Sequence, residues 1–311
     1  MKQNLAIGTD IGGSHISCAA IDLASGKILR ETISEKEVNN QAPAIEIIST
    51  WADALRKCIN KAPEGSVKGI GFAIPGPFDY VKGICLIKGV SKYENLYGLN
   101  IGDAIRKSLN LPESFLVRFM NDASSFAVGE AWAGKASKAV RSLSITLGTG
   151  FGSAFIENHI PVVDGPRVPR LGCVYHLPYN GEIADETFST RGFIRSYKKA
   201  TGKDVSGVKE LSAMAASDKT VMSIFYEFGD NLGAFLSPWL KRFVAEILVV
   251  GGNISHAYNL FGDSFEKRLK KEKCDCKVEL SVLKEDAALL GGAYLFNDDF
   301  WNAVQHALPL M

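Results

Sequence analysis

Long hydrophobic runs are missing from this sequence, and no apolar stretch approaches the roughly 20 residues that a bilayer-spanning helix requires. The first apolar run, 5–7, stops at Gly8-Thr9-Asp10, so we expect no signal peptide. Cysteine is also scarce: the six residues are scattered, mostly within apolar patterns, where a free thiol behaves as a small hydrophobe. These absences predict a cytoplasmic protein with no membrane association and no disulfide framework.

An excess of charge of either sign is missing as well. The 35 basic and 34 acidic residues give a formal net charge of +1, which provides no long-range field to attract nucleic acid. The sequence also contains neither a G-x-x-x-x-G-K-[ST] loop nor a G-x-G-x-x-G fingerprint, so neither a P-loop fold nor a dinucleotide-binding fold is indicated. A length of 311 residues suffices for two domains that each bury a core.

The strand and helix pattern predicts an α/β protein with an internal duplication. Residues 5–10, 15–22 and 27–33 are typical of three strands, and helical and strand patterns alternate after them. The strand, glycine turn and strand at 143–157 repeat the arrangement at the start of the chain. Two such units, each opening an α/β half, predict a ligand cleft between the halves.

Two glycine-rich turns are suited to holding a polyphosphate. Such a ligand needs backbone N–H groups within close reach, and glycine removes the side chain that would block its approach. Asp10 stands beside the first turn, where its carboxylate could hold the hydration shell of Mg²⁺. Each turn alone is more typical of an ordinary hairpin, but two in a duplicated context favour a nucleotide site. The candidate residues are Gly12, Gly13 and Ser14, then Gly148, Thr149, Gly150 and Gly152.

Asn121-Asp122 lies where a predicted strand gives way to a helix. An aspartate there can cap the helix through the first N–H groups, and the same N–H groups favour an ionised carboxylate. A general base for a hydroxyl group must be ionised near neutral pH, so capping and catalysis are compatible. Gly251-Gly252 follows another apolar strand and suits close approach by a nucleotide, although glycines at such positions often serve packing.

Taken together, these motifs resemble the ROK family of sugar kinases and sugar-responsive repressors, over about residues 5–295. The motifs that carry the resemblance are Asp10-Ile11-Gly12-Gly13-Ser14, Gly71-Phe72-Ala73-Ile74-Pro75-Gly76, Asn121-Asp122-Ala123, Leu147-Gly148-Thr149-Gly150-Phe151-Gly152 and Val250-Gly251-Gly252. The resemblance implies duplicated actin-like ATPase (ribonuclease H-like) domains, which we place at 1–119 with a C-terminal helix at about 292–311, and at 120–291.

The resemblance also implies roles for single residues. Asp122 is the general base, a sugar lies against Pro75, Gly76 and Asn121, and ATP is held by the two turns and Gly251-Gly252. Asp10 assists the metal through water. A homodimer is expected by resemblance alone.

The chain departs from the family pattern between residues 172 and 186. The family carries Gly-Glu-Ile-Gly-His after its second turn, and this chain has Cys173 where the glutamate stands, while His176 is retained. The family's zinc-binding cysteine cluster is replaced by a cysteine-free run, 179–186, so we expect no structural zinc. Glu186 resembles the glutamate that ends that cluster and contacts sugar.

The expected reaction is ATP-dependent phosphorylation of a hexose hydroxyl, with the 6-hydroxyl and glucose as defaults. Cys173 in place of glutamate leaves N-acetylmannosamine, fructose and allose open as substrates. One rival is a non-catalytic sugar sensor without a DNA-binding domain, because a first strand at Leu5 leaves no room for a helix-turn-helix before it. An actin-like filament ATPase is a third possibility.

Overall fold

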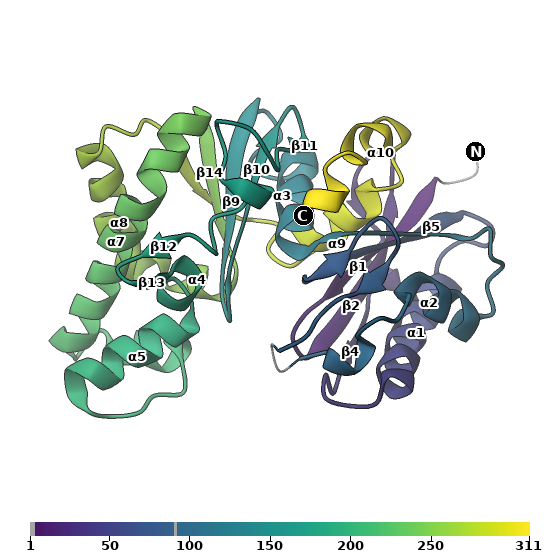
Figure 1. The fold of residues 1–311 in the computed structure, drawn as a ribbon, viewed down its shortest axis with the longest axis horizontal. Coiled ribbons are helices and arrows are strands. Elements are labelled where there is room, and N and C mark those ends of the chain that lie inside the picture. Colours follow the sequence, from purple (N-terminus) through teal and green to yellow (C-terminus); the bar gives the residue numbers. More distant parts are fainter. Residues whose placement is uncertain (1–3, 90–91) are drawn as a thin grey trace. The chain divides into compact units, whose positions relative to one another are not determined.

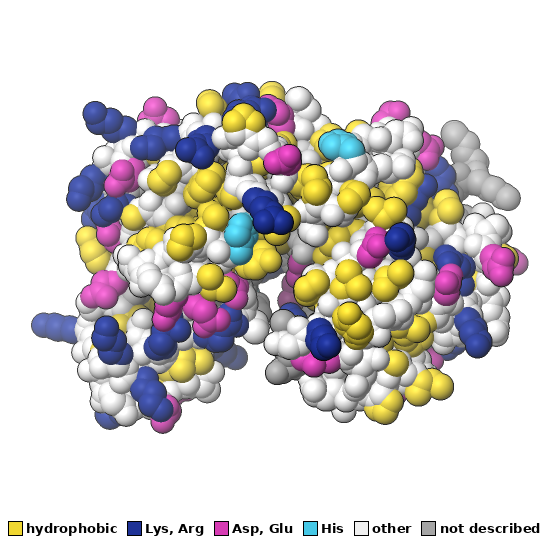
Figure 2. All heavy atoms as spheres, in the orientation of Figure 1, with side chains coloured by type: hydrophobic (Ala, Val, Ile, Leu, Met, Phe, Trp, Pro, Cys, Tyr) yellow, Lys and Arg dark blue, Asp and Glu magenta, His cyan; other side chains and the backbone are white. Residues whose placement is uncertain are grey.

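The computed structural model describes residues 4–89 and 92–311, and the chain forms two compact units. Unit 1 comprises residues 1–137, 159–161 and 285–311, and unit 2 comprises residues 138–158 and 162–284. Each unit is built on its own mixed β-sheet with helices packed against it (Figure 1). On the face shown in Figure 2, basic and acidic side chains are intermingled over each unit.

Unit 1 carries a sheet in the order β3-β2-β1-β5-β8, with β4 paired to β2. The strand β1 is antiparallel to β2 and parallel to β5, and β5 is parallel to β8. The elements are β1 (Leu5–Ile11), β2 (His15–Asp22), β3 (Lys27–Ile28), β4 (Ser34–Glu37), α1 (Ala44–Lys61), β5 (Val67–Ile74), β6 (Phe78–Asp79), β7 (Ile84–Cys85), α2 (Ile101–Leu109), β8 (Leu116–Asn121), α3 (Asp122–Ala133), α9 (Asp286–Tyr294) and α10 (Asp298–Val304).

Unit 2 repeats the order of four of these strands, as β10-β9-β14-β15. Here β9 is antiparallel to β10 and parallel to β14, which is parallel to β15. The elements are β9 (Arg141–Leu147), β10 (Phe151–Glu157), β12 (Pro178–Tyr179), β13 (Glu182–Ile183), α4 (Ala184–Thr187), α5 (Thr190–Thr201), α6 (Val208–Met214), α7 (Lys219–Phe243), β14 (Ile247–Gly251), α8 (Tyr258–Lys271) and β15 (Lys277–Leu280). The short strand β11 (Ile160–Pro161) lies in the segment 159–161, which belongs to unit 1. The predicted duplication is therefore confirmed: β2-β1-β5-β8 in unit 1 and β10-β9-β14-β15 in unit 2 have the same order and the same relative directions.

The predicted strand 27–33 is only partly correct, because β3 ends at Ile28 and a 3₁₀ turn, Arg30–Thr32, follows. The Thr32 hydroxyl explains the change. It donates to Leu29 O at 2.6 Å and accepts from the amide of Ala20 in β2 at 2.9 Å. A side chain thus makes the bond to β2 that a backbone carbonyl would make in a longer strand.

Helix α9 packs against α3 and against the sheet of unit 1 through glycine. An added Cβ would lie within about 2 Å of a facing backbone oxygen at each of four positions, so no larger residue fits. These positions, with the opposing oxygens, are Gly8 (Leu289 O), Gly71 (Gly292 O), Gly129 (Ala287 O) and Gly291 (Ser125 O). This contact explains why unit 1 extends to residue 137 and resumes at 285, whereas the sequence placed the divisions at 119/120 and 291/292.

An aromatic cluster forms the core of unit 2. Phe188 is fully buried and its ring lies 5.5 Å from that of Phe151, 5.9 Å from that of Phe228 and 5.1 Å from that of Phe235. Phe151 begins β10 and Phe228 and Phe235 lie on α7, so the segment after α4 is anchored to both the sheet and the long helix. Burial of such side chains contributes about 1.5–3 kcal/mol each.

Candidate active site

The first glycine turn, residues 12–14, joins β1 to β2 and directs amide groups outward. The N–H of Gly12 donates to His15 O at 3.0 Å, whereas those of Gly13 and Ser14 have no acceptor among the described residues. The three carbonyl oxygens are all bound: Tyr93 Oη donates to Gly12 O at 2.7 Å, Asn40 Nδ2 to Gly13 O, and Val38 N to Ser14 O at 2.8 Å. Because the carbonyls are held, the turn offers donors to an anion.

The second turn, residues 148–152, repeats this arrangement between β9 and β10. Gly148 N donates to Gly150 O at 3.0 Å, and the amides of Thr149 and Gly150 have no acceptor in the part of the chain that the structure describes. Thr190 donates to Gly148 O through both its amide, at 2.9 Å, and its hydroxyl, at 3.0 Å. No atom lies within 4 Å of a Cβ added at Gly148 or, in unit 1, at Gly13, so each turn leaves space at its tip.

Gly251 and Gly252 lie beside the second turn. Gly251 pairs with Thr146 in the sheet, and a Cβ on Gly252 would come within 2.4 Å of Leu147 O. Gly252 has a φ of 80°, which also favours glycine. The structure therefore brings two of the predicted nucleotide motifs together within unit 2.

Three carboxylates of unit 1 interact electrostatically. Asp10 lies near the end of β1, and its pKa is raised to about 7 by burial and by the negative charges of Asp122 and Glu285. Repulsion among these groups fits a divalent cation nearby, which would favour the ionised form of Asp10. No set of three His, Cys, Asp or Glu side chains within residues 4–89 and 92–311 is placed to hold a metal ion. One or two carboxylates acting through water, with substrate phosphates, is the usual Mg²⁺ arrangement.

Asp122 is the first residue of α3. The side-chain cap of this helix, which the sequence predicted for Asp122, is made by Asn121. The Asn121 side chain accepts from Ser124 N at 3.2 Å, while Asp122 Oδ1 accepts from Ala123 N at 2.9 Å. Burial raises the pKa of Asp122, and the Ala123 N–H and the charge of Lys92 oppose that rise. One carboxylate oxygen of Asp122 is thus bound to the helix start.

A buried tyrosine connects Asn121 to the Pro75-Gly76 segment. Tyr80 Oη donates to Ile74 O at 3.2 Å and lies 3.3 Å from Asn121 Nδ2, which donates to it. A Cβ on Gly76 would come within 3.2 Å of the same hydroxyl. Gly76, Asn121 and the carbonyl that precedes Pro75 therefore lie around one side chain that the sequence did not single out.

The predicted sugar residues of unit 2 lie in two hydrogen-bonded segments. Asp185 N donates to Tyr175 O at 2.9 Å, which joins the neighbours of Glu186 and His176. His176 Nδ1 lies 3.8 Å from Cys173 Sγ. Burial lowers the pKa of His176, with Arg170 adding to the effect, and burial raises the pKa of Cys173 to about 12. This pair is therefore neutral near pH 7, and Cys173 carries no charge to offer a hydroxyl.

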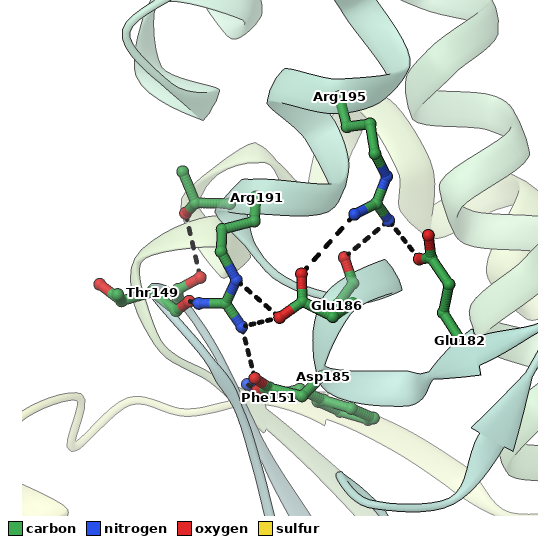
Figure 3. Close-up of polar contacts among 9 residues, drawn as sticks. Thr149, Phe151, Glu182, Asp185, Glu186, Arg191 and Arg195 are labelled. Atoms are coloured by element: carbon green, nitrogen blue, oxygen red, sulfur yellow. Dashed lines mark hydrogen bonds and ion pairs between the residues drawn. The ribbon is translucent and has the colours of Figure 1, made fainter. Parts of the chain in front are cut away.

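Glu186 is held by two guanidinium groups (Figure 3). Its Oε1 accepts from Arg191 Nε at 3.0 Å, and its Oε2 lies 3.6 Å from Arg195 Nη1. Arg195 also binds Glu182 of β13. In the cysteine-free run 179–186, where the family carries its zinc cluster, the structure has the hairpin β12–β13 and the start of α4.

Several residues of these sites carried no signal in the sequence. Tyr93 and Asn40 bind the first turn from 81 and 27 residues away, and Arg191 binds the second from 42 residues away. Such contacts are fixed by tertiary packing. For Asp185, adjacency to Glu186 was the one available signal.

The fold is of the actin-like ATPase class. The ROK family model matches residues 6–299, and the chain belongs to the ROK family. It is 26% identical to a glucokinase of Halalkalibacterium halodurans, over 95% of this chain and 96% of that protein. It is 24% identical to an N-acetyl-D-glucosamine kinase of Vibrio cholerae, over 93% of this chain and 98% of that protein.

The fold is shared with a solved ROK hexokinase from Thermus thermophilus, at a TM-score of 0.75 and 21% identity over 96% of this chain and 99% of that one. The predicted family and fold class are thus confirmed, and the relatives support the expected sugar kinase. None of the helices among the described residues combines the length and apolar character that crossing a membrane requires.

Proposed function

We propose that this protein transfers the γ-phosphoryl group of ATP to a hexose, with the primary 6-hydroxyl as acceptor and Asp122 as general base. The observation that carries the proposal is in unit 1, where Asp122 interacts with Asp10 beside a turn that has two unpaired amides among the described residues. The ROK family and the two curated relatives support the reaction class.

The phosphates of ATP would bind at the two turns. The amides of Gly13 and Ser14 in unit 1, and of Thr149 and Gly150 in unit 2, are donors without a protein acceptor among the described residues. Phosphate oxygens satisfy such donors, and the held carbonyls avoid repulsion. Gly251 and Gly252 would let the nucleotide approach the end of β14 closely.

Mg²⁺ fits the carboxylates of unit 1, and Asp10 would hold it through water. When bound, the ion neutralises charge on the phosphate oxygens during transfer. It would also favour the ionised form of Asp10, whose pKa is raised to about 7 without it.

Asp122 would orient the acceptor hydroxyl and finally take its proton. The sugar oxygen then forms a bond to the γ-phosphorus as the bond from that phosphorus to the bridging oxygen of ADP breaks. Burial raises the pKa of Asp122 and makes it a better base, while the Ala123 N–H and Lys92 favour its ionised form. Positioning and electrostatics supply most of the catalysis in such reactions.

In unit 1, Pro75, Gly76 and Asn121 are the proposed sugar ligands, and in unit 2, His176 and Glu186 are. His176 is neutral near pH 7 and can both donate and accept. Cys173 cannot supply the charge-assisted bonds that a carboxylate would give a hydroxyl. Because of this difference, N-acetylmannosamine, fructose and allose stand beside glucose as candidate acceptors.

A substrate panel tests the proposal. Purified protein with Mg²⁺-ATP is assayed for ADP release against hexoses and N-acetylhexosamines, and the product is examined by ³¹P NMR. Sugar-dependent release with phosphorus coupled to the two C6 protons supports the reaction. Sugar binding by calorimetry without release would favour a sensor, and nucleotide-dependent sedimentation without a sugar effect would favour a filament ATPase.

A further inference from the structure

One guanidinium group in unit 2 contacts both the second glycine turn and the predicted sugar ligand Glu186. Arg191, in the first turn of α5, donates from Nη1 to Thr149 O at 2.7 Å. The same group binds Glu186 through Nε at 3.0 Å and Asp185 through Nη2 (Figure 3). Thr149 belongs to the second glycine turn, and Glu186 is the predicted sugar ligand, so one side chain contacts both.

Asp185 completes the connection. Its Oδ1 accepts from the amide of Phe151 at 2.6 Å, while its Oδ2 accepts from Arg191. A Cβ on Gly150 would lie only 3.0 Å from Asp185 Oδ1, so glycine at this position makes room for the carboxylate. The turn is therefore held by a carboxylate at one backbone N–H and by a guanidinium at one carbonyl.

The aromatic core of unit 2 anchors the segments that carry the second turn and Glu186. Phe151 and Phe188 pack edge to face, and Phe188 follows Glu186 by two residues. The Asp185 side chain is 23% exposed and that of Arg191 43% exposed, so solvent reaches the cluster only in part. Charge-assisted hydrogen bonds of this kind are roughly twice as strong as neutral ones. The planar guanidinium group of Arg191 donates to three acceptors: Thr149 O, Glu186 and Asp185.

We propose that Asp185 and Arg191 are positioning residues that hold the second turn in its nucleotide-binding form and hold Glu186 for the sugar. The inference rests on the proposed function for the identity of the ligands. The role that we propose for Arg191 is indirect, since Arg191 itself is not a proposed nucleotide ligand. Loss of its guanidinium group would release the Thr149 carbonyl and so change the affinity of the second turn for nucleotide.

Arg195 provides a matched control on the same helix. It binds Glu182 and the backbone oxygen of Glu186, and it approaches the Glu186 carboxylate at 3.6 Å. It has no contact with the turn 148–152 among the described residues. Arg191→Lys and Arg195→Lys therefore each keep a positive charge beside Glu186, and only the first releases the turn.

The test titrates the wild type and both variants with the ATP analogue AMP-PNP and Mg²⁺ by calorimetry. We expect Arg191→Lys to raise the Kd about tenfold, equivalent to about 1.4 kcal/mol, and Arg195→Lys to change it less than about twofold. Asp185→Asn keeps an oxygen for the Phe151 amide and loses the charge facing Arg191, so its Kd should rise about threefold. Thermal melting within a few degrees for all variants excludes general unfolding.

Kinetics with a sugar accepted by the wild type give a second readout. Both lysine variants should raise KM for the sugar, only Arg191→Lys should raise KM for ATP, and kcat at saturation should change little. Equal nucleotide affinity in the two lysine variants would overturn the positioning role. If the wild type binds AMP-PNP but phosphorylates no sugar, the proposed function fails, while the titration still tests the positioning role of Arg191 and Asp185. A wild type that binds no nucleotide overturns both.

Discussion

Asp10 shows how the site chemistry appears at the scale of one residue. Its carboxyl has a pKa raised to about 7 by burial and by the charges of Asp122 and Glu285, against a usual value of 3.8. Between these pH values the folded protein binds more protons than the unfolded chain does, so stability falls as pH rises. The contribution of Asp10 is complete below about pH 4 and is lost as pH passes through 7.

Asp10→Asn removes this ionisation. In the absence of Mg²⁺, we expect the variant to raise Tm relative to the wild type at pH 7.5 and to have a smaller effect at pH 5, because the wild-type carboxyl is protonated there. Thermal melting in EDTA at both pH values checks this. A difference in Tm that is the same at both values would contradict the raised pKa.

The sequence offers as candidates the residues whose chemical type stands out, and it gives no sign of those that only tertiary contacts bring to the same place. Asp10, Asn121, Asp122 and the glycines were predicted because carboxylates and glycine turns stand out beside apolar strands. Tyr80 and Arg191 were missed, because an ordinary tyrosine or arginine is indistinguishable in sequence until the fold places it at 3.3 Å from Asn121 Nδ2 or 2.7 Å from Thr149 O.

At the scale of elements, α9 depends on close backbone contact as well as on buried side chains such as Leu289 and Leu290. A Cβ on Gly291 would lie 1.9 Å from Ser125 O of α3, so Gly291→Ala forces the two helices apart. We expect the free energy of unfolding to fall by roughly 2–3 kcal/mol, as for overpacked cores. Gly13→Ala is the stability control, since nothing lies within 4 Å of its added Cβ.

Thermal melting compares the two alanine variants. Gly291→Ala should lower Tm by several degrees, and Gly13→Ala should leave Tm close to that of the wild type because surface changes are usually within about 0.5 kcal/mol. Equal Tm values for the two variants would show that α9 and α3 tolerate separation, and would contradict a stabilising role for their close backbone contact.

Strand boundaries were predicted well where apolar periodicity is strong. They were predicted less well where a side chain makes a hydrogen bond that the backbone of a longer strand would make. The predicted strand 15–22 is present with the same bounds, and the unit predicted at 143–157 begins slightly earlier, at Arg141. Thr32 ended the third strand early through its hydroxyl, and the sequence offered no sign of that hydrogen bond.

At the scale of the whole molecule, the duplicated topology could be predicted because each half repeats a hairpin with a glycine turn. The division between the units could not, because it depends on α3 packing against α9, from segments far apart in the chain. The sequence also left the sugar open, since Cys173 replaces a charged group by a neutral one.

The most direct measurement compares sugar-dependent ADP release by the wild type and by Asp122→Asn, with AMP-PNP affinity measured for both. The account predicts release by the wild type and a loss of at least about 100-fold in the variant, since general acid–base catalysis contributes about 10²–10⁴ in rate, with analogue affinity within about threefold. Turnover by Asp122→Asn close to that of the wild type would contradict the assignment of Asp122 as the base.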